Sequence, residues 1–256
     1  MQPRVLILHA NGTNRDHDAA LALEAAGART EIRPINDLRA ARTGWGDYQM
    51  LVVPGGFSYA DALGAGKLLA IDLNSYFAAE VQAFVAAGKP VIGICNGFQA
   101  LVKAGVLPGR DDLRATLTFN QAGHFECRWV RLLPVSPVCV WTRGLAEAIE
   151  CPVAHGEGNF VLADPAGLER LEAAGQVALV YAGPDGARAQ GRYPSNPNGS
   201  LGDLAGICNP AGNVLGLMPH PEDYIHPHQH PRWTRGKRGG LGLPLFKSGL
   251  AYASGL

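Results

Sequence analysis

Residues 90–99, Pro-Val-Ile-Gly-Ile-Cys-Asn-Gly-Phe-Gln, constrain the fold more than any other stretch of the chain. A short β-branched run, Val91–Ile94, leads directly into Cys95, which lies between Gly93 and Gly97. This order predicts a buried strand, a tight turn and a helix, because glycines let the backbone bend sharply. On such a turn the cysteine sulfur lies at the N-terminus of the helix, where free N–H groups and the helix dipole favour a thiolate. The stretch therefore predicts a nucleophile elbow with Cys95 as the nucleophile.

The segments before this turn alternate between strand and helix patterns. Apolar runs predict strands, and the Ala- and Leu-rich segment 16–26 predicts a helix that ends at Gly27. A β-α-β order is typical of a parallel sheet, in which the carboxyl ends of all strands meet at one edge. Ligand sites in open α/β sheets form at that edge, so the loop 54–61 is expected beside Cys95. The strands expected before the turn are Val5–His9, Thr30–Ile35 and Tyr48–Val53.

After Gly105 the pattern changes to shorter strands with polar connections. We find no internal repeat and no linker, so we predict one α/β domain over residues 1–256, with a mostly parallel central sheet flanked by helices. Residues 184–200, rich in Gly, Pro, Asn and Ser, are expected to form a loop. Further strands are expected at Leu113–Phe119, at Phe125–Leu133, within Val153–Leu162, at Val177–Tyr181 and, last, at Val214–Met218, and helices at Tyr76–Ala87, Gly167–Ala174 and Leu245–Ala253.

Composition and charge argue against several function classes. The 256 residues are 47% hydrophobic and 17% charged, as in a compact protein rather than a disordered one. Lys+Arg and Asp+Glu both total 22, so no overall basic field favours a nucleic-acid partner. No apolar stretch approaches the roughly 20 residues that span a bilayer, and no signal peptide precedes the first strand. We therefore expect a cytoplasmic protein that binds neither nucleic acid nor membrane.

Five cysteines are scattered along the chain, and no two form a C-x-x-C pair. Their odd number and irregular spacing predict free thiols, and argue against both a disulfide framework and a zinc site. Apart from Cys95, each is expected to be an inert, buried, small apolar side chain. The other four are Cys127, Cys139, Cys151 and Cys208.

A second motif, His220-Pro221-Glu222, supplies the partners that a cysteine nucleophile needs. A base must take and return protons, and the base needs an acceptor on its other nitrogen. His220 and Glu222 follow a predicted buried strand, which places them at the same sheet edge as Cys95. Pro221 restricts its own backbone and that of His220. An inert cysteine and a structural histidine would each be unremarkable alone, but the two motifs together predict a Cys-His-Glu triad.

Acyl chemistry also needs hydrogen-bond donors for the negative charge that develops on the reacting oxygen. The N–H of Asn96, directly after the nucleophile, is one candidate. A glycine N–H from Pro54-Gly55-Gly56 is the other, although a Gly-Gly pair by itself fits a plain turn equally well. The expected place of this loop at the sheet edge favours the role of a donor.

The elbow and the His-x-Glu motif belong to a set of five stretches: Pro54–Tyr59, Gly93–Gln99, Phe125–Trp129, His155–Gly158 and Met218–Glu222. Together they resemble the class I (triad) glutamine amidotransferases, and within that class the glutaminase subunits of phosphoribosylformylglycinamidine synthase. The resemblance covers nearly the whole chain and implies a flavodoxin-like fold. The Cys-Asn-Gly-Phe-Gln and Phe-Glu-Cys-Arg-Trp stretches distinguish these subunits from other members of the class. One departure is Ala60, where most relatives are expected to carry glycine, which implies a small change in the loop without loss of its donors.

The resemblance implies a mechanism. Cys95 would attack the side-chain amide of glutamine, while the N–H groups of Gly56 and Asn96 hold the oxyanion. His220, oriented by Glu222, would protonate the departing ammonia and then activate the water that releases glutamate from the thioester. The positions that match glutamine-binding residues of the class are Gly55, Gln99, Gly156 and Glu157.

The resemblance also implies partners. In this family the ammonia passes to a separate large synthetase subunit, PurL, which uses ATP and Mg²⁺ to convert formylglycinamide ribonucleotide to the amidine, and a small subunit, PurS, completes the complex. The chain lacks the Gly-x-x-x-x-Gly-Lys-Ser/Thr phosphate loop. We therefore expect no cofactor and no metal in this chain, with ATP and Mg²⁺ on the partner. Weak activity is expected for the isolated chain, because partner binding can complete a catalytic site.

Two other interpretations remain open from the sequence. A DJ-1/PfpI-like hydrolase or stress protein would have a similar scaffold. Those proteins typically place histidine directly after the nucleophile, where this chain has Asn96, and they leave the His220-x-Glu222 motif unexplained. A non-catalytic assembly subunit would keep the fold but would not need an intact triad.

The segment after the triad carries two features outside it. His226, His228 and His230 alternate, so an extended segment would place them on one face, as a metal site requires. A solvated loop is the favoured interpretation, because no fixed carboxylate or cysteine lies nearby and prolines interrupt the segment. A basic cluster follows, and it fits either a solvated surface or a docking site for the synthetase. The cluster comprises Arg232, Arg235, Lys237 and Arg238.

Overall fold

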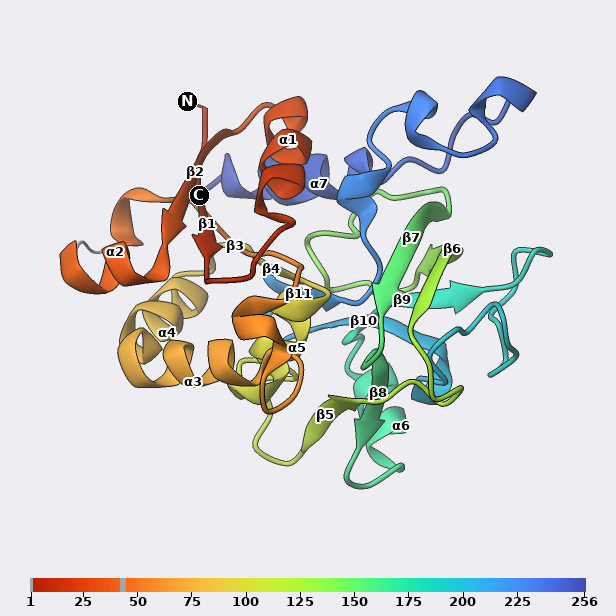
Figure 1. The fold of residues 1–256 in the computed structure, drawn as a ribbon, viewed down its shortest axis with the longest axis horizontal. Coiled ribbons are helices and arrows are strands. Elements are labelled where there is room, and N and C mark those ends of the chain that lie inside the picture. Colours follow the sequence, from red (N-terminus) through yellow and green to blue (C-terminus); the bar gives the residue numbers. More distant parts are fainter. Residues whose placement is uncertain (1, 42–44) are drawn as a thin grey trace.

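The turn at Cys95 lies at the end of a central strand in a nine-stranded sheet with the order β2-β1-β3-β4-β11-β10-β9-β6-β7. The computed structural model describes residues 2–41 and 45–256, and it places the two ends of the chain on the same side of the molecule (Figure 1). Met1 and residues 42–44 of the predicted domain lie outside the described residues. Buried apolar side chains from both halves of the sheet form one continuous core.

Five neighbouring strands form the parallel half of the sheet. Register pairs show that each strand runs parallel to its neighbour, from β2 at the edge to β11 at the centre. The strands lie close to their predicted positions, and their carboxyl ends share one edge, as expected. In sheet order they are β2 (Arg29–Pro34), β1 (Arg4–His9), β3 (Met50–Val53), β4 (Val91–Ile94) and β11 (Val214–Leu217).

The other four strands are antiparallel to their neighbours. Because the direction alternates from β11 onward, β10 and β6 are antiparallel to β4, whereas β9 and β7 are parallel to it. Seven of the nine described strands therefore point the same way, which confirms a mostly parallel sheet. The carboxyl end of β7 consequently lies at the same edge as Cys95. These strands are β10 (Leu204–Cys208), β9 (Val177–Ala182), β6 (Glu126–Pro134) and β7 (Ile149–His155).

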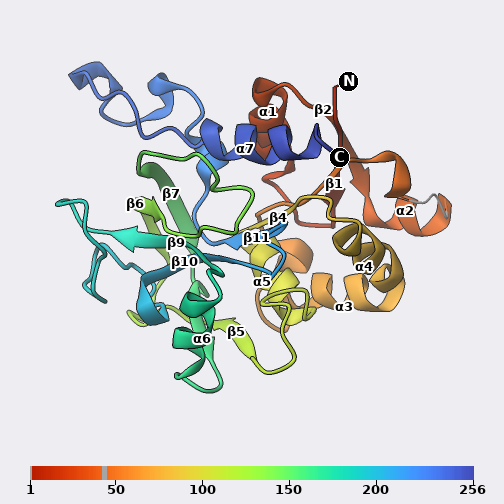
Figure 2. The same cartoon turned by 180° about the vertical axis from the view of Figure 1, so that it is seen from behind.

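Helices cover both faces of the parallel half. Helices α1 (Asp16–Ala26) and α7 (Leu243–Ala253) lie together on one face, and α3, α4 and α5 lie on the other, as both views show (Figures 1 and 2). The bounds of the other elements in the described chain complete the fold. Those not yet given are α2 (Ile35–Ala41), α3 (Lys67–Tyr76), α4 (Ala78–Ala86), α5 (Asn96–Lys103), α6 (Gly167–Ala173), the paired strands β5 (Ala115–Thr118) and β8 (Asn159–Leu162), and 3-10 turns at Trp45–Asp47, Ser58–Asp61, Leu201–Asp203, Pro221–Asp223, Pro227–Gln229 and Trp233–Arg235.

The structure contains one strand and two helices that were not predicted from the sequence. Strand β10 was not predicted, because its five-residue run, Leu-Ala-Gly-Ile-Cys, is short and follows a long polar loop. Helices α2 and α3 were not predicted either. The helix expected at Tyr76–Ala87 is confirmed as α4, and it is separated from α3 at Phe77, where the backbone is not helical (φ −130°, ψ 15°). Within the described ranges, no helix is both long and apolar enough to cross a bilayer.

The strand, turn and helix at Cys95 form as predicted, and glycine is required at one position for a steric reason. Cys95 has φ 51° and ψ −106°, a conformation that side chains rarely adopt. A Cβ atom on Gly97 would lie 1.8 Å from the carbonyl oxygen of Val53, at the end of β3. Helix α5 can therefore begin over the ends of β3 and β4 only if residue 97 has no side chain.

This contact predicts that Gly97→Ala lowers the free energy of unfolding by roughly 3 kcal/mol, because the buried backbone at Val53 cannot move away. Urea denaturation followed by circular dichroism would measure the loss. Gly46→Ala is the matched control, since a Cβ atom there meets nothing within 4 Å, and it should change stability by less than about 0.5 kcal/mol. Equal stabilities for the two variants would contradict the packing argument.

Candidate active site

The three side chains predicted as a triad meet at the carboxyl ends of β4 and β11. Cys95 follows β4, and His220 and Glu222 lie at the 3-10 turn after β11. Nδ1 of His220 is 2.7 Å from Oε1 of Glu222, and all three side chains are buried. A Cβ atom on Gly55 would lie 2.8 Å from Cε1 of His220 and 3.5 Å from Cβ of Cys95, so both residues lie against this glycine.

Electrostatics favour the charged form of the histidine. Burial by itself would lower the pKa of His220, but the Glu222 carboxylate and the Cys95 sulfur together raise it well above the ordinary value. The main chain of His220 is also fixed, because its N–H donates to the carbonyl oxygen of Pro152 on β7 at 2.9 Å. Since Nδ1 faces Glu222, Nε2 is the atom available to Cys95. An imidazole oriented in this way is the partner that a cysteine nucleophile requires.

Cys95 lines a pocket of about 180 Å³. This volume lies below the range of about 300–1,000 Å³ that is typical for drug-sized ligands, so the pocket suits a molecule the size of an amino acid. Three of the predicted glutamine-binding residues and one predicted oxyanion donor line the pocket with Cys95, and Gly55 lies behind it against His220. The four are Gly56, Gln99, Gly156 and Glu157.

Main-chain amides next to the nucleophile are available as oxyanion donors. Asn96 is the first residue of α5, so its N–H has no acceptor within the helix. Its side chain is turned to the loop after β3, where Nδ2 is 2.7 Å from Oδ1 of Asp61 and Oδ1 accepts from the Ser58 hydroxyl. Gly56 has φ 123°, and a Cβ atom there would lie 2.6 Å from the backbone nitrogen of Asn14, so only glycine fits.

The loop that carries Ser58 and Asp61 has a left-handed backbone. Tyr59, Ala60 and Asp61 have φ angles of 55°, 56° and 52°, which residues with a side chain adopt at a cost of about 1–2 kcal/mol. This conformation gives a physical reason for the glycine that is expected at position 60 in most relatives, because glycine adopts it without a steric cost. The alanine retains the turn, since its N–H donates to the Phe57 carbonyl oxygen at 2.8 Å.

Gln99 and Glu157 bind each other across the pocket wall. Nε2 of Gln99 donates to the carbonyl oxygen of Glu157 at 2.6 Å, and Oε1 of Gln99 is 3.4 Å from Nδ2 of Asn96. The Glu157 carboxylate accepts from the N–H of Ala65, at 3.3 Å from either oxygen. Gln99 therefore ties α5 to the loop after β7. Direct contact of these residues with glutamine stays a prediction.

His155, at the end of β7, lines the same pocket, although its motif alone gives it no role. Nδ2 of Asn120 donates to the carbonyl oxygens of His124 and His155, at 2.9 and 2.8 Å, so Oδ1 of Asn120 must be an acceptor. It accepts from Nδ1 of His155 at 3.1 Å and from the N–H of Gly158 at 2.9 Å. The neutral ring therefore carries its proton on Nδ1, and Nε2 is a buried acceptor without a partner in the described chain. Burial and the charge of His220 lower the pKa of His155 to about 3.

Comparison with known proteins agrees with this geometry. The family model of the CobB/CobQ-like glutamine amidotransferase domain matches residues 2–253. The chain belongs to this family. The predicted class of enzyme, a glutamine amidotransferase, is therefore confirmed.

Individual amidotransferase relatives match nearly the whole chain. A protein of Treponema denticola, described as phosphoribosylformylglycinamidine synthase subunit PurQ, is 54% identical over 268 residues, which cover 98% of this chain and 99% of the relative. A protein of Dehalococcoides mccartyi with the same description is 42% identical over 256 residues, with 98% and 97% covered. A chain in the structure of PurLQS from Thermotoga maritima is 31% identical, with a TM-score of 0.77 and 98% and 99% covered. These matches confirm the predicted α/β amidotransferase fold.

An ion pair that was not predicted lies beside the amidotransferase triad. Arg15, between β1 and α1, is 3.1 Å from Oδ2 of Asp223 and 2.9 Å from Oδ2 of Asp18. Burial and the neighbouring Glu222 charge raise the pKa of Asp223 to about 6, against the opposing effects of His220 and Arg15. The pair ties the turn that carries the triad to the start of α1. No local pattern could predict a contact between residues 208 positions apart.

The three alternating histidines do not share a face, contrary to the extended geometry considered from the sequence. The 3-10 turn Pro227–Gln229 interrupts the segment, and the exposed His226 and His228 stack with ring centroids 5.4 Å apart. His230 is buried against Trp129, with centroids 4.4 Å apart. Among the described residues, no group of three or more potential ligands is placed to hold a metal ion.

One expectation about the cysteines was wrong. Cys127 is exposed, because successive side chains of β6 point to opposite faces of the sheet and Cys127 lies on the face opposite the buried Glu126. Cys139, Cys151 and Cys208 are buried, as expected, and all five thiols are free.

Replacing His155 should reduce the acid sensitivity of folding. In the unfolded chain a histidine binds a proton below about pH 6.5, whereas in the folded chain the pKa of His155 is about 3. Between these values the unfolded state binds more protons, so acid destabilises the wild type through this residue by up to about 1.4 kcal/mol per pH unit. Urea denaturation between pH 7 and 4.5 should therefore show a shallower loss of stability for His155→Gln.

The matched control for this measurement is His228→Gln, which removes an exposed imidazole. Its stability should follow the wild-type pH dependence. A His155→Gln curve that runs parallel to the wild-type curve would contradict the buried neutral state of His155.

Proposed function

We propose that this chain is the glutaminase subunit of a phosphoribosylformylglycinamidine synthase in de novo purine biosynthesis. It hydrolyses L-glutamine to glutamate and passes the ammonia to a synthetase subunit. The observation that carries the proposal is the convergence of Cys95 with the buried His220–Glu222 pair, whose interacting atoms are 2.7 Å apart, at the pocket of an amidotransferase chain. Relatives that carry this description support the choice of substrate and pathway, because two of them are 54% and 42% identical over almost the full chain.

In the proposed reaction the Cys95 sulfur attacks the side-chain carbonyl carbon of glutamine. The charge on the carbonyl oxygen is stabilised by the N–H groups of Gly56 and Asn96. His220, charged in this site, gives its proton to the nitrogen as the carbon–nitrogen bond breaks, and ammonia leaves a thioester. The neutral His220 then takes a proton from water, which attacks the thioester and releases glutamate. Glu222 holds His220 in the required orientation throughout.

The proposal includes partners that are absent from this chain. The similar Thermotoga maritima chain belongs to a structure of PurLQS, and this assembly supports PurL and PurS as the partners here. We assign ATP and Mg²⁺ to the synthetase, and no cofactor to this chain. The cytoplasmic location stays a prediction. Membership in the amidotransferase family leaves the DJ-1/PfpI-like interpretation without support, whereas a non-catalytic assembly subunit remains the alternative that experiments must exclude.

An electrophilic diazo-ketone analogue of glutamine should label Cys95, because the pocket brings the analogue to the activated sulfur. Mass spectrometry of proteolytic peptides would locate the label, and Cys95→Ala should abolish both labelling and glutamine-dependent ammonia release. The exposed Cys127 is a control within the same molecule, and it should stay unmodified. Failure to label Cys95 even with PurL and PurS present would favour the non-catalytic alternative.

Glu222→Gln should lower kcat for glutamine hydrolysis by roughly 10²–10⁴-fold, because the carboxylate that keeps the His220 imidazolium charged is lost. The rate of ammonia release should be measured with PurL and PurS, and synthesis driven by added ammonium salt should be unchanged. Asp223→Asn, a change at the adjacent acid outside the triad, is the matched control and should cost less than about tenfold. If both variants lose activity equally, Glu222 has no special role.

A further inference from the structure

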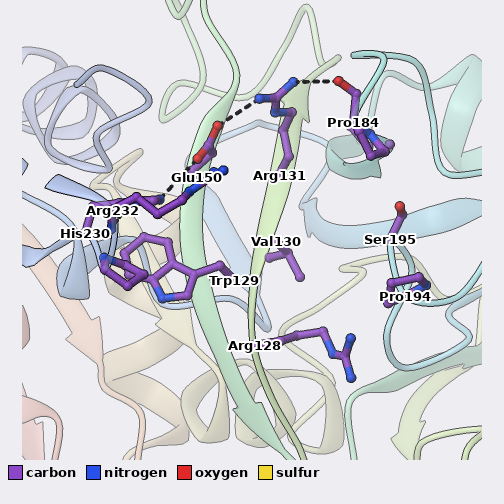
Figure 3. A pocket seen from close by; sticks show the side chains of 13 residues that line it. Arg128, Trp129, Val130, Arg131, Glu150, Pro184, Pro194, Ser195, His230 and Arg232 are labelled. Carbon is purple, nitrogen blue, oxygen red and sulfur yellow. Dashed lines mark hydrogen bonds and ion pairs between the residues drawn. The ribbon is translucent and has the colours of Figure 1, made fainter. Parts of the chain in front are cut away.

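A cavity of about 470 Å³ lies in the antiparallel half of the sheet, away from Cys95. It shares no lining residue with the pocket beside Cys95, and the proposed reaction gives it no role. One wall is β6. Figure 3 shows Pro184, Pro194 and Ser195 across from that strand. The cavity therefore lies along one side of β6.

That side of β6 is a free strand edge over half of its length. β6 spans Glu126–Pro134, but β9 pairs only with its second half, Arg131–Pro134. β9 ends at Ala182, and the chain then reverses direction within residues 183–187. Residues 126–130 are therefore paired with β7 on one side and, within the described chain, with no strand on the other. At about 3.3 Å per residue, this free edge is about 16 Å long.

The hydrogen-bond pattern shows which main-chain groups lie on the free edge of β6. The N–H of Val135 donates to the carbonyl oxygen of Ala178, just beyond the paired part of β9 and β6. In an antiparallel pair such contacts recur at every second residue. The odd-numbered residues of β6 therefore direct their N–H and C=O groups toward the β9 side. For Trp129 and Cys127, β9 has already ended, so these groups lie on the free edge.

The pairing on the other side of β6 agrees with this assignment. Trp129 lies opposite Pro152 of β7, and proline has no N–H to donate. The carbonyl oxygen of Pro152 instead accepts from the N–H of His220. Among the described residues, no turn, loop or side chain provides an acceptor for the amide of Trp129 or Cys127. The edge is thus open to a strand from outside the chain.

Cationic side chains surround this edge, although the whole chain has a net charge of zero. Arg128, Arg131 and Arg232 line the cavity, and Glu150 is the one carboxylate in its wall, while Arg128 is also paired with the buried Glu126 behind it at 2.6 Å. Oε1 of Glu150 is 2.8 Å from both Arg131 and Lys237, so a single negative charge serves two cations. Arg232 is exposed and has no carboxylate within ion-pair distance in the described chain. The local excess of positive charge favours an acidic occupant.

The unpaired donors and acceptors of the free edge favour a peptide over a small anion as the occupant of the cavity. A phosphate or carboxylate could accept from the arginines and the free N–H groups, but it would leave the carbonyl oxygens of Cys127 and Trp129 without donors. An extended peptide provides alternating donors and acceptors and completes both. We propose that the free half-edge of β6 binds an extended acidic segment of the synthetase by strand addition. This inference rests on the proposed function, which supplies the synthetase as the partner.

Of the basic cluster Arg232, Arg235, Lys237 and Arg238, one residue is placed to contact the proposed acidic segment. Lys237 is held by Glu150, and Arg238 donates to the main-chain carbonyl oxygens of Trp233 and Lys237. Arg232 lines the cavity, whereas Arg235 does not. Arg232 is therefore the member of the cluster that would meet the acidic segment.

The first test removes the edge donor. Cys127→Pro deletes an N–H of the free edge, next to the cavity. The side chain of Cys127 is exposed, and its N–H takes no part in the pairing with β7, so the fold should tolerate the change. Binding to the PurL–PurS assembly, measured by surface plasmon resonance, should weaken at least tenfold relative to Cys127→Ala, which keeps the N–H. In wild-type protein, hydrogen exchange of peptides covering residues 126–130 should slow at least tenfold when the assembly is added.

The second test concerns charge. Arg232→Glu should weaken binding roughly three- to tenfold, and less so at high salt, whereas Arg235→Glu is the matched control and should bind as the wild type does. Arg128 is not a suitable site, because it pairs with the buried Glu126 at 2.6 Å and a reversal would disturb the fold. Diazo-ketone labelling of Cys95 in each variant shows that the fold and the catalytic pocket are intact.

The outcomes separate this inference from the proposed function. If the wild type binds the assembly and delivers ammonia, but residues 126–130 exchange at the same rate and Cys127→Pro binds as Cys127→Ala does, strand addition is wrong and the proposed function stands. Weaker binding of Arg232→Glu without protection of these amides also overturns strand addition. Protection that depends on the concentration of this chain alone would assign the edge to a second copy. If no complex forms with PurL and PurS, both proposals fail.

Discussion

The active site depends on one close contact between backbones, where the main chain of Gly97 lies against the carbonyl oxygen of Val53. This contact lets α5 begin directly over the end of β3, so the glycines after β3 and the first amide of α5 lie beside the same sulfur. Cys95 must then adopt φ 51°, at a cost of roughly 1–3 kcal/mol. Two main-chain hydrogen bonds hold it there: its N–H donates to the Leu217 carbonyl oxygen at 2.7 Å, and its carbonyl oxygen accepts from Gln99 N–H at 3.0 Å.

The parts of the site that the sequence predicts are those set by short segments. The elbow follows from a β-branched run and two glycines within seven residues, and His220 and Glu222 are adjacent in the same turn. Strand β10 was not predicted because its assignment depends on burial between β9 and β11 rather than on its own pattern. The tautomer of His155 could not be predicted either, because it is set by a hydrogen bond to Asn120, which lies 35 residues away in the sequence.

The alternating directions of the last four strands have a functional consequence. Because β10 and β6 run against the sheet, β7 ends at the same edge as β4 and β11. The carboxyl end of β7 thus brings His155, Gly156 and Glu157 to the pocket that Cys95 lines. A purely parallel sheet would need a crossover connection between each pair of these strands, whereas antiparallel neighbours can be joined without one.

Strand β7 also connects the active site to the free edge of β6. The carbonyl oxygen of Pro152 fixes the main chain of His220, and Pro152 lies directly opposite Trp129 in the β6–β7 pair. A segment that pairs with Trp129 on its open side would therefore add a third strand to the pair that positions His220. Pairing on both sides restricts the motion of a strand more than pairing on one. In the proposed complex with the synthetase, the β6–β7 pair at the edge of the sheet is thus placed to make the position of His220 more rigid. The more mobile His220 of the isolated chain gives a structural reason for the low activity that is expected without the partner. The reaction rate falls in proportion to the fraction of time that the base spends in the reactive geometry.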